Sequence, residues 1–157
     1  MAMAEKSKLK QLVMQYLDEA KLMQIATVNG DRPWVATVWY AADKDMNLYF
    51  VSRTFRRHSM EMMKNPNVAG TIVKPHTIGS GEKVRGLQFE GTGRICNEKE
   101  FRIEHELYSK RYIGARIPPI SEGNANEMVK FYIIKPKLFV LFDEVNFPEE
   151  PRQELPL

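Results

Sequence analysis

The hydrophobic pattern changes its period near residue 21, and this change restricts the folds open to the chain. Residues 6–20 repeat apolar side chains at helical spacing, which indicates an amphipathic helix that covers an apolar surface. From Met23 onward the apolar runs are short and are separated by turn residues, the first of them Asn29-Gly30-Asp31. A covering helix followed by adjacent hairpins favours a mainly β fold, either a meander or a small barrel.

The remaining elements follow from the same signals. Helices are predicted over residues 57–64 and 98–108, the first ended by Pro66. Loops are predicted over residues 74–82 and 113–126, and the proline-containing tail 147–157 is expected to lie over a surface without forming an element. The predicted strands are residues 23–28, 34–41, 48–52, 68–73, 84–95, 129–135 and 138–144, the last two hinged at Pro136.

Two of these strands have informative faces. Residues 34–41 are apolar on both faces, so we expect this strand to be buried on both sides. Residues 84–95 place polar side chains, among them Gln88 and Glu90, on one face. That face requires water, a ligand or a partner subunit, because buried unpaired polar groups are costly. Gly91 and its neighbouring glycines predict bulges or close backbone approach.

Composition narrows the class of protein. The 157 residues fit one domain, residues 1–157, with residues 1–20 as a covering helix and 145–157 as a tail. No apolar run reaches the roughly 20 residues that span a bilayer, and residues 1–6 lack a secretory signal, so a cytoplasmic location and no membrane partner are predicted. Cys96 is the one cysteine, and the three histidines show no metal-ligand spacing, so no metal is predicted.

The net charge of +3 is modest, and the Lys and Arg residues are spread along the chain. Only the segment 52–59 (Ser-Arg-Thr-Phe-Arg-Arg-His-Ser) gathers cations, between a predicted strand and a predicted helix. Free N–H groups and the helix dipole favour an anion at such a junction. On spacing alone, an anion pocket and a solvated basic turn are equally compatible with the segment.

Three blocks of sequence carry a resemblance to a known family. They are Ala26-Thr27-Val28 with residues 33–40 (Pro-Trp-Val-Ala-Thr-Val-Trp-Tyr), residues 48–52 with Arg57-His58 and residues 65–69 (Asn-Pro-Asn-Val-Ala), and residues 84–91 (Val-Arg-Gly-Leu-Gln-Phe-Glu-Gly). In their order and spacing the chain resembles the pyridoxamine-phosphate-oxidase-like split-barrel flavoproteins from about Ile25 to Phe142.

The resemblance implies a six-stranded split β-barrel that forms a homodimer with FMN at the subunit interface. It places the flavin phosphate against Ser52, Arg57 and His58, next to Val51, with Arg53 and Arg56 on the solvent side. It lays the flavin ring along the second strand, at Ala36, Thr37, Val38 and Trp39. Gln88 of the partner subunit would close the site. A His58 side chain next to a phosphate is expected to have a raised pKa.

Departures from the family pattern bear on the substrate. The vitamin B6 oxidase has arginine and lysine where this chain has Ala36 and Ala41, and a tyrosine where it has Leu107; its carboxy-terminal Trp and Gly-Arg-Leu pattern is missing. Arg111 still fits the pattern, and Arg111 and Tyr112 are the predicted substrate-side residues. Without the other charge-assisted contacts to a substrate phosphate, vitamin B6 oxidase activity is not expected.

Three functions were weighed. The first is an FMN-dependent oxidoreductase that acts on an unknown small substrate, with NAD(P)H as a possible electron donor and no catalytic side chain identified. The second is a carrier or sensor that binds FMN, haem or F420 without turnover, since one fold can host all three. The third, a basic barrel that binds nucleic acid, is disfavoured because Trp34, Trp39 and Tyr40 lie among apolar residues and not among cations.

Overall fold

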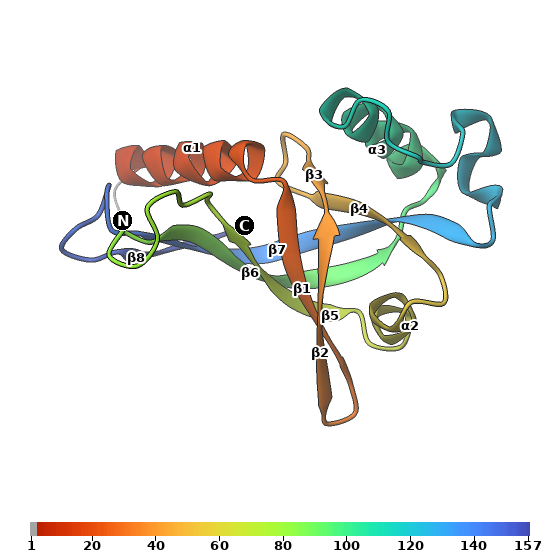
Figure 1. The fold of residues 1–157 in the computed structure, drawn as a ribbon, viewed down its shortest axis with the longest axis horizontal. Coiled ribbons are helices and arrows are strands. Elements are labelled where there is room, and N and C mark those ends of the chain that lie inside the picture. The colour runs from red at the N-terminus through yellow and green to blue at the C-terminus, as the bar shows by residue number, and fades with distance from the viewer. Residues whose placement is uncertain (1–2) are drawn as a thin grey trace.

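The computed structural model describes residues 3–157, and its core is one antiparallel β-sheet (Figure 1). Neighbouring strands follow the order β2-β1-β5-β6-β7-β4-β3, with β8 paired to β7. The chain therefore has the mainly β split-barrel fold that was expected, but with eight strands in place of six. The strands are β1 (Leu22–Asn29), β2 (Arg32–Trp39), β3 (Ala41–Ala42), β4 (Leu48–Arg53), β5 (Asn67–Val73), β6 (Arg85–Ile95), β7 (Val129–Asp143) and β8 (Arg152–Pro156).

Three α-helices and one 3-10 helix pack against this sheet (Figure 1). The helix α1 (Met3–Glu19) contacts β3, β6, β7 and β8, whereas α2 (Arg57–Lys64) contacts β1, β2 and β6. The helix α3 (Glu98–Arg111) contacts β3 and β7, together with the 3-10 helix η1 (Ile120–Ala125). The predicted positions of all three α-helices are confirmed. The first two residues of the predicted covering helix lie outside the described part of the chain.

The sheet separates two apolar clusters. The main core joins one face of α1, including Leu9, Val13 and Tyr16, to inward side chains such as Phe50 and Phe139. The second cluster lies under α3 and contains Tyr49, Cys96, Phe101, Tyr108 and Phe131. Because Tyr49 and Phe50 are consecutive, β4 sends side chains into both clusters. Strands buried on both faces read as continuous apolar runs, and β4 is one of them.

The prediction that residues 34–41 are buried on both sides was wrong for this chain. Trp34, Val35 and Trp39 are 42%, 59% and 53% exposed. The reason is topological, because β2 pairs only with β1 and is therefore an edge strand of the sheet. Ala36 and Val38 pack against the main core, while Val35, Thr37 and Trp39 lie on the opposite, exposed face.

The predicted hinge at Pro136 was also wrong, because β7 is one continuous strand from Val129 to Asp143. Pro136 lies opposite Gly91, where the register between β6 and β7 shifts between Glu90 and Gly91. Proline has no N–H to donate to the neighbouring strand, and a bulge tolerates this missing donor. The strand therefore continues through Pro136. The glycine-based prediction of a bulge in this strand is confirmed at Gly91.

The carboxy-terminal tail forms an element, contrary to prediction. Residues 152–156 form β8, which pairs with β7 from Leu138↔Pro156 to Phe142↔Arg152, and Leu155 is buried in the main core. Pro156 is tolerated because it lies at the end of a short edge strand. The tail therefore closes one side of the sheet.

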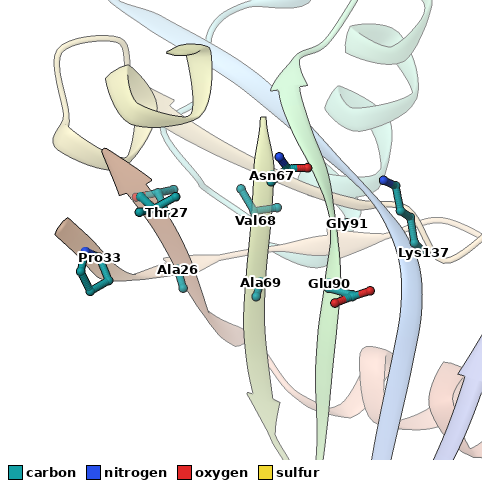
Figure 2. Close-up of a pocket in the computed structure, with 10 residues that line it drawn as sticks. Ala26, Thr27, Pro33, Asn67, Val68, Ala69, Glu90, Gly91 and Lys137 are labelled. Carbon is teal, nitrogen blue, oxygen red and sulfur yellow. The ribbon is translucent and has the colours of Figure 1, made fainter. Parts of the chain in front are cut away.

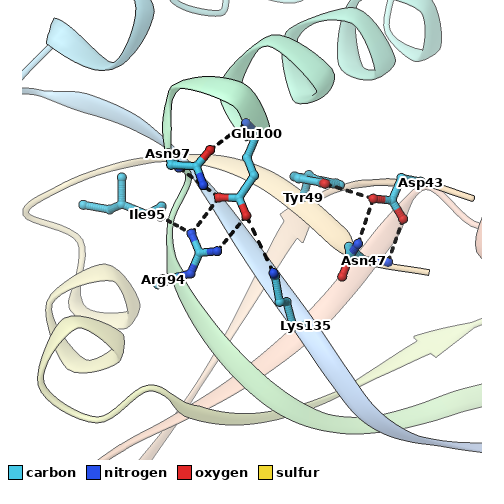
Figure 3. Close-up of polar contacts among 8 residues, drawn as sticks. All are labelled: Asp43, Asn47, Tyr49, Arg94, Ile95, Asn97, Glu100 and Lys135. Carbon is cyan, nitrogen blue, oxygen red and sulfur yellow. Dashed lines mark hydrogen bonds and ion pairs between the residues drawn. The ribbon is translucent and has the colours of Figure 1, made fainter. Parts of the chain in front are cut away.

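The helix α3 is held at its N-terminus by a polar network (Figure 3). Asn97 and Glu100 form a capping box, in which each side chain accepts a hydrogen bond from the other residue's backbone N–H at 2.9 Å. Arg94 donates to both carboxylate oxygens of Glu100 at 2.6 Å.

Among residues 3–157, no helix combines the length and hydropathy that a membrane span requires.

Candidate functional site

The predicted phosphate-binding residues lie where β4 passes into α2. Ser52 is near the end of β4, a turn closed by the Arg56 N–H and the Arg53 carbonyl follows at 3.1 Å, and Arg57 and His58 open the helix. The N-cap residue Arg56 is extended and makes no side-chain cap, so no side chain competes for the first N–H groups of α2. These free donors and the positive end of the helix dipole favour an anion at this position.

Ser52, His58 and Ser59 form a short hydrogen-bonded chain. The Ser59 hydroxyl donates to Ser52 Oγ at 3.2 Å, and Ser52 Oγ lies 2.8 Å from His58 Nε2. His58 is 8% exposed, and its burial, with a further contribution from Arg56, lowers its pKa below the usual value. A neutral imidazole accepts the Ser52 proton at Nε2, so the three groups are satisfied without a ligand.

Arg57 is held from two sides. Its Nε donates to Glu61 Oε1 at 2.7 Å, and its guanidinium carbon lies 4.4 Å from the centre of the Trp34 ring. The Thr27 hydroxyl donates to the second carboxylate oxygen of Glu61 at 2.6 Å. This hydrogen bond, followed by the one from Arg57, lowers the pKa of Glu61, so the carboxylate is ionised. We refer to Thr27, Trp34, Arg57 and Glu61 as the Arg57 clamp.

The other two arginines of the segment face solvent. Arg53 and Arg56 are exposed, and each guanidinium carbon lies 5.8 Å from the centre of the exposed Phe55 ring. Neither residue is engaged by a buried carboxylate as Arg57 is. Within the basic turn, the structure therefore distinguishes one held arginine from two solvated ones.

The predicted flavin-ring segment lies on the exposed edge strand. Ala36 and Val38 point toward the core, and Thr37 and Trp39 point away from it. The chain places this strand near β4, and Val51 packs at the rim of the cluster under α3. The edge of β2 that faces away from β1 carries backbone groups without a strand partner, so this edge can bind a planar polar ring.

Gln88 lies far from Ser52 within one chain. The two residues pair with opposite ends of β7, Gln88 with Val140 and Ser52 with Lys130. Extended strand rises about 3.3 Å per residue, so roughly 30 Å of β7 separates these positions. A single chain does not bring Gln88 to the predicted phosphate-binding residues.

Arg111 and Tyr112 are engaged in structural contacts. The Arg111 guanidinium donates to the carbonyls of Leu17, Asp18 and Ala20 and to Asp18 Oδ1, where α1 ends. The Tyr112 hydroxyl donates to the Tyr40 carbonyl at 2.6 Å, and its ring meets Trp39 edge-on at 5.5 Å. Their assignment to a substrate stays a prediction, although Tyr112 does border the end of the flavin-ring segment.

An open groove of about 460 Å³ lies over β1, β5 and β6 (Figure 2). Pro33 lies at one side of the groove and Glu90 with Lys137 at the other, over a floor that includes Ala26 and Ala69. A second groove of about 440 Å³ shares Ala26, Ala69 and Glu90 with it and extends to Gln88. This face of β1, β5 and β6 is therefore hollowed and largely apolar.

Sequence reasoning missed Thr27, Trp34, Ser59 and Glu61 as members of the site. The i, i+4 spacing of Arg57 and Glu61 on a predicted helix is a usable signal for their ion pair. Thr27 and Trp34 are a direct cross-strand pair in the β1–β2 hairpin. Their contact with α2 depends on how the hairpin packs, which local spacing does not encode.

Comparison with known proteins identifies the family and the fold. A family model described as pyridoxamine 5'-phosphate oxidase matches residues 9–139. The split-barrel fold also matches the haem storage protein HutZ of Vibrio cholerae, with a TM-score of 0.66 and 16% identity over 82% of this chain and 89% of that one. An F420 reductase matches with a TM-score of 0.58 and 24% identity over 80% of this chain and 93% of that one. The chain belongs to the pyridoxamine 5'-phosphate oxidase family.

Within that family, the sequence is similar to the UPF0306 proteins and not to the vitamin B6 oxidase itself. A UPF0306 protein of Photorhabdus laumondii is 30% identical over 123 residues, which are 75% of this chain and 83% of the relative. A UPF0306 protein of Haemophilus ducreyi is 26% identical over 113 residues, 70% of this chain and 76% of the relative. The resemblance drawn from the three sequence blocks is thereby confirmed.

Proposed function

We propose that the chain binds FMN and acts as a flavin-dependent oxidoreductase on a small substrate. The observation that carries the proposal is which nitrogen atoms of the Arg57 side chain take part in hydrogen bonds. Among the described residues its hydrogen bonds engage only Nε, which leaves both terminal amino groups available. Two parallel N–H donors of a guanidinium match two oxygens of a phosphate.

The remaining donors also fit a phosphate monoester. Ser52, His58 and the first N–H groups of α2 all lie within the same strand-to-helix junction. A dianion placed there favours protonated His58, in which Nε2–H donates to Ser52 and frees the Ser52 proton for a phosphate oxygen. The chain then holds the phosphate, while the edge of β2 at Ala36–Trp39 orients the flavin ring.

Bound FMN would supply the redox chemistry, and the chain would supply binding, orientation and exclusion of water. Trp39 and Tyr112 form an aromatic border at one end of the ring-binding segment. Arg111 maintains that border indirectly, because it ties the end of α3 to the end of α1. The substrate and the electron donor, for which NAD(P)H is the candidate, would enter from this side.

We further propose that the functional unit is a homodimer with FMN bound at the subunit interface. Gln88 reaches the phosphate-binding residues only if a second copy supplies it. The face of β2 that carries Val35 and Trp39 is apolar and exposed in one chain, as expected of a surface that a second copy covers. The hollowed face of β1, β5 and β6 is continuous with it through the β1–β2 pairing.

The second candidate is a non-catalytic binder of FMN, haem or F420. It is favoured by the fold shared with a haem storage protein and with an F420 reductase. An FMN carrier and an FMN-dependent enzyme need the same phosphate-binding residues, so the geometry of the junction supports both.

The visible spectrum of the purified protein is the test. FMN binding predicts absorption maxima of oxidised flavin, release of FMN on denaturation, and restoration of colour when FMN is added to stripped protein. Bleaching by NADH or NADPH without oxygen supports the oxidoreductase, whereas a stable oxidised spectrum supports the carrier. A haem Soret band or an F420 spectrum would instead identify haem or F420 as the cofactor. Failure of added FMN to bind at all would overturn the proposal.

A further inference from the structure

The Arg57 clamp joins a helix to a hairpin through two matched pairs. On α2, Arg57 and Glu61 are one helical turn apart and therefore lie on the same face. On the hairpin, Thr27 and Trp34 are directly opposite each other and therefore also share a face. Thr27 contacts Glu61 and Trp34 contacts Arg57, so each helix residue has its own partner on the hairpin.

Burial shows that this arrangement is built into the packing. Glu61 is 5% exposed and Thr27 is 3% exposed, whereas the Arg57 side chain is 42% exposed. The fixed end of the network is therefore buried and the arginine is at its open end. A buried carboxylate that accepts two hydrogen bonds has little freedom to move, and it fixes the edge of the guanidinium that faces it.

We infer that Glu61 and Thr27 are positioning residues that direct the terminal amino groups of Arg57 toward the phosphate of FMN. The inference rests on the proposed FMN binding and adds the part of the site that sets its geometry. Glu61 occupies the Nε edge of the guanidinium, and the face of Trp34 limits rotation of its plane. The two free donors then remain on the side of the guanidinium away from Glu61.

The clamp also links the two ends of the proposed cofactor site. Trp34 lies on β2, two residues before Ala36, where the proposed flavin-ring segment begins. Arg57 lies at the opposite, phosphate-binding end of the site. Contact between these two residues fixes the position of α2, which would bind the phosphate, relative to β2, which would orient the ring. A cofactor that spans both is bound best when that register is kept.

The sign of one mutational effect separates positioning from simple electrostatics. A carboxylate near a phosphate repels it, so removal of a bystander Glu61 would tighten FMN binding. If Glu61 positions Arg57, Glu61→Ala weakens FMN binding in spite of the lost repulsion, and we expect about a fivefold or greater increase in Kd. Alanine is a strong helix former, so α2 is retained.

Thr27→Val tests the other end of the clamp with a side chain of the same shape. The variant lacks the hydroxyl that donates a hydrogen bond to Glu61. We expect it to raise the Kd for FMN about two- to fivefold. Glu106→Gln is the matched control. It removes the i, i+4 ion pair between Glu106 and Lys110 on the exposed face of α3. We expect the Kd of this variant to equal that of the unmodified protein.

Fluorescence titrations with FMN and with riboflavin give the required readout. A positioning role in phosphate binding raises the Kd for FMN and leaves the Kd for riboflavin, which lacks the phosphate, within about twofold. A loss of packing would weaken both ligands and lower the melting temperature. In an Arg57→Ala background, Glu61→Ala should no longer weaken FMN binding, because the residue acts through Arg57.

The outcomes keep the two proposals apart. If the unmodified protein binds neither ligand, the proposed function fails. If FMN binds and Arg57→Ala weakens it, while Glu61→Ala tightens FMN or leaves it unchanged, the positioning inference alone is overturned. Equal weakening of FMN and riboflavin by Glu61→Ala would also overturn it.

Discussion

At the end of β4, one imidazole and two hydroxyls hydrogen-bond to one another, and the guanidinium of Arg57 beside them keeps both terminal amino groups unused among the described residues. This contrast assigns different roles to neighbouring residues of the basic turn. Ser52 and His58 must reverse the direction of their mutual hydrogen bond before Ser52 can donate to a ligand, whereas Arg57 gives up no hydrogen bond when it binds an anion. Arg57 is therefore the residue from which most of the phosphate affinity is expected.

Replacing Arg57 with alanine tests this assignment. A charge-assisted hydrogen bond is worth about 1.5–3 kcal/mol, so Arg57→Ala is expected to raise the Kd for FMN by about 10- to 150-fold. Arg53→Ala is the matched control, since it removes one positive charge from the same turn and should change the Kd by less than about threefold. Isothermal titration calorimetry with FMN measures both. Equal losses for the two variants would contradict the assignment within the turn.

His58 predicts a pH dependence of FMN binding. Burial lowers its pKa in the protein without ligand, and a neighbouring phosphate dianion raises it, so binding takes up a proton. The contribution of His58 to affinity should therefore be fully present below the lowered pKa of the unliganded protein, and it should be lost as pH rises from there through the raised pKa of the complex. We expect the Kd to increase about tenfold at most per pH unit between pH 6.5 and 8.5.

His58→Gln provides the reference for that measurement, because the phosphate of FMN itself titrates near pH 6. The variant keeps a side chain that can bond Ser52 but does not titrate in this range. Its Kd should change with pH less than that of the unmodified protein. Identical pH profiles, or calorimetry that detects no proton uptake, would exclude His58 from the phosphate site.

At the scale of elements, α3 contains a buried acid that the proposed function does not use. Glu104 is 0% exposed, and neither carboxyl oxygen has a hydrogen-bond partner among the described residues. Burial, with a smaller contribution from Asp43, raises its pKa well above the usual value, so the folded chain holds the proton. The helix thus packs on β3 and β7 with a neutral acid at its centre.

Glu104→Gln should reveal this proton as a change in stability. Above about pH 4.3 the unfolded chain releases the proton and the folded chain keeps it, so stability of the unmodified protein falls as pH rises toward the raised pKa. Glutamine does not titrate, and we expect the variant to be more stable by about 1–3 kcal/mol at pH 8 and nearly equal at pH 4. Urea unfolding at both pH values measures this. Glu106→Gln, exposed on the same helix, should not change the pH dependence, and a Glu104→Gln profile parallel to the unmodified one would refute the prediction.

The bulge between β6 and β7 leaves no room for a side chain at Gly91. A Cβ on Gly91 would lie 2.3 Å from the Lys135 carbonyl oxygen and 2.7 Å from Pro136 Cα, both backbone atoms. Gly91→Ala is therefore expected to destabilise the fold by about 1–3 kcal/mol in urea unfolding. Gly86→Ala on the same strand meets its nearest atom at 3.0 Å and should cost less. Equal losses would mean that the close approach at Gly91 relaxes.

At the scale of the whole molecule, the three α-helices leave one sheet face exposed. The face that carries Val35 and Trp39 on β2, and Gln88 on β6, points away from the main core. In the proposed homodimer a second copy covers it and brings Gln88 to the phosphate of its partner. The prediction of a strand buried on both sides would then apply to the dimer and not to the single chain.

Val35→Asp tests this arrangement. The residue is 59% exposed on the edge strand, so one chain tolerates a carboxylate there, whereas an apolar interface would not. We expect the variant to elute as a folded monomer in light-scattering chromatography and to lose FMN. Ile78→Asp, 83% exposed in the loop before β6, should remain dimeric. A Val35→Asp variant that stays dimeric would place the interface elsewhere.

Local sequence patterns predicted the three α-helices and most of the strands, and the resemblance of three sequence blocks to a known family predicted the split-barrel fold and the candidate phosphate-binding residues Ser52, Arg57 and His58. The i, i+3 and alternating patterns report on which side of an element is apolar, and that information is local. The pairing of β8 with β7 and the passage of β7 through Pro136 were not predicted, because a neighbouring strand supplies what proline lacks.

Only the tertiary structure decided that Thr27 and Trp34 contact α2, that β2 is an edge strand, and that β4 is buried on both faces. Each of these depends on which strands pair and in what register, over sequence separations that no local period records. The basic turn shows the division most clearly. Its cations and hydroxyls were visible in the sequence, but only the packing of the β1–β2 hairpin against α2 showed that Arg57 is held at Nε and that its two terminal amino groups stay available.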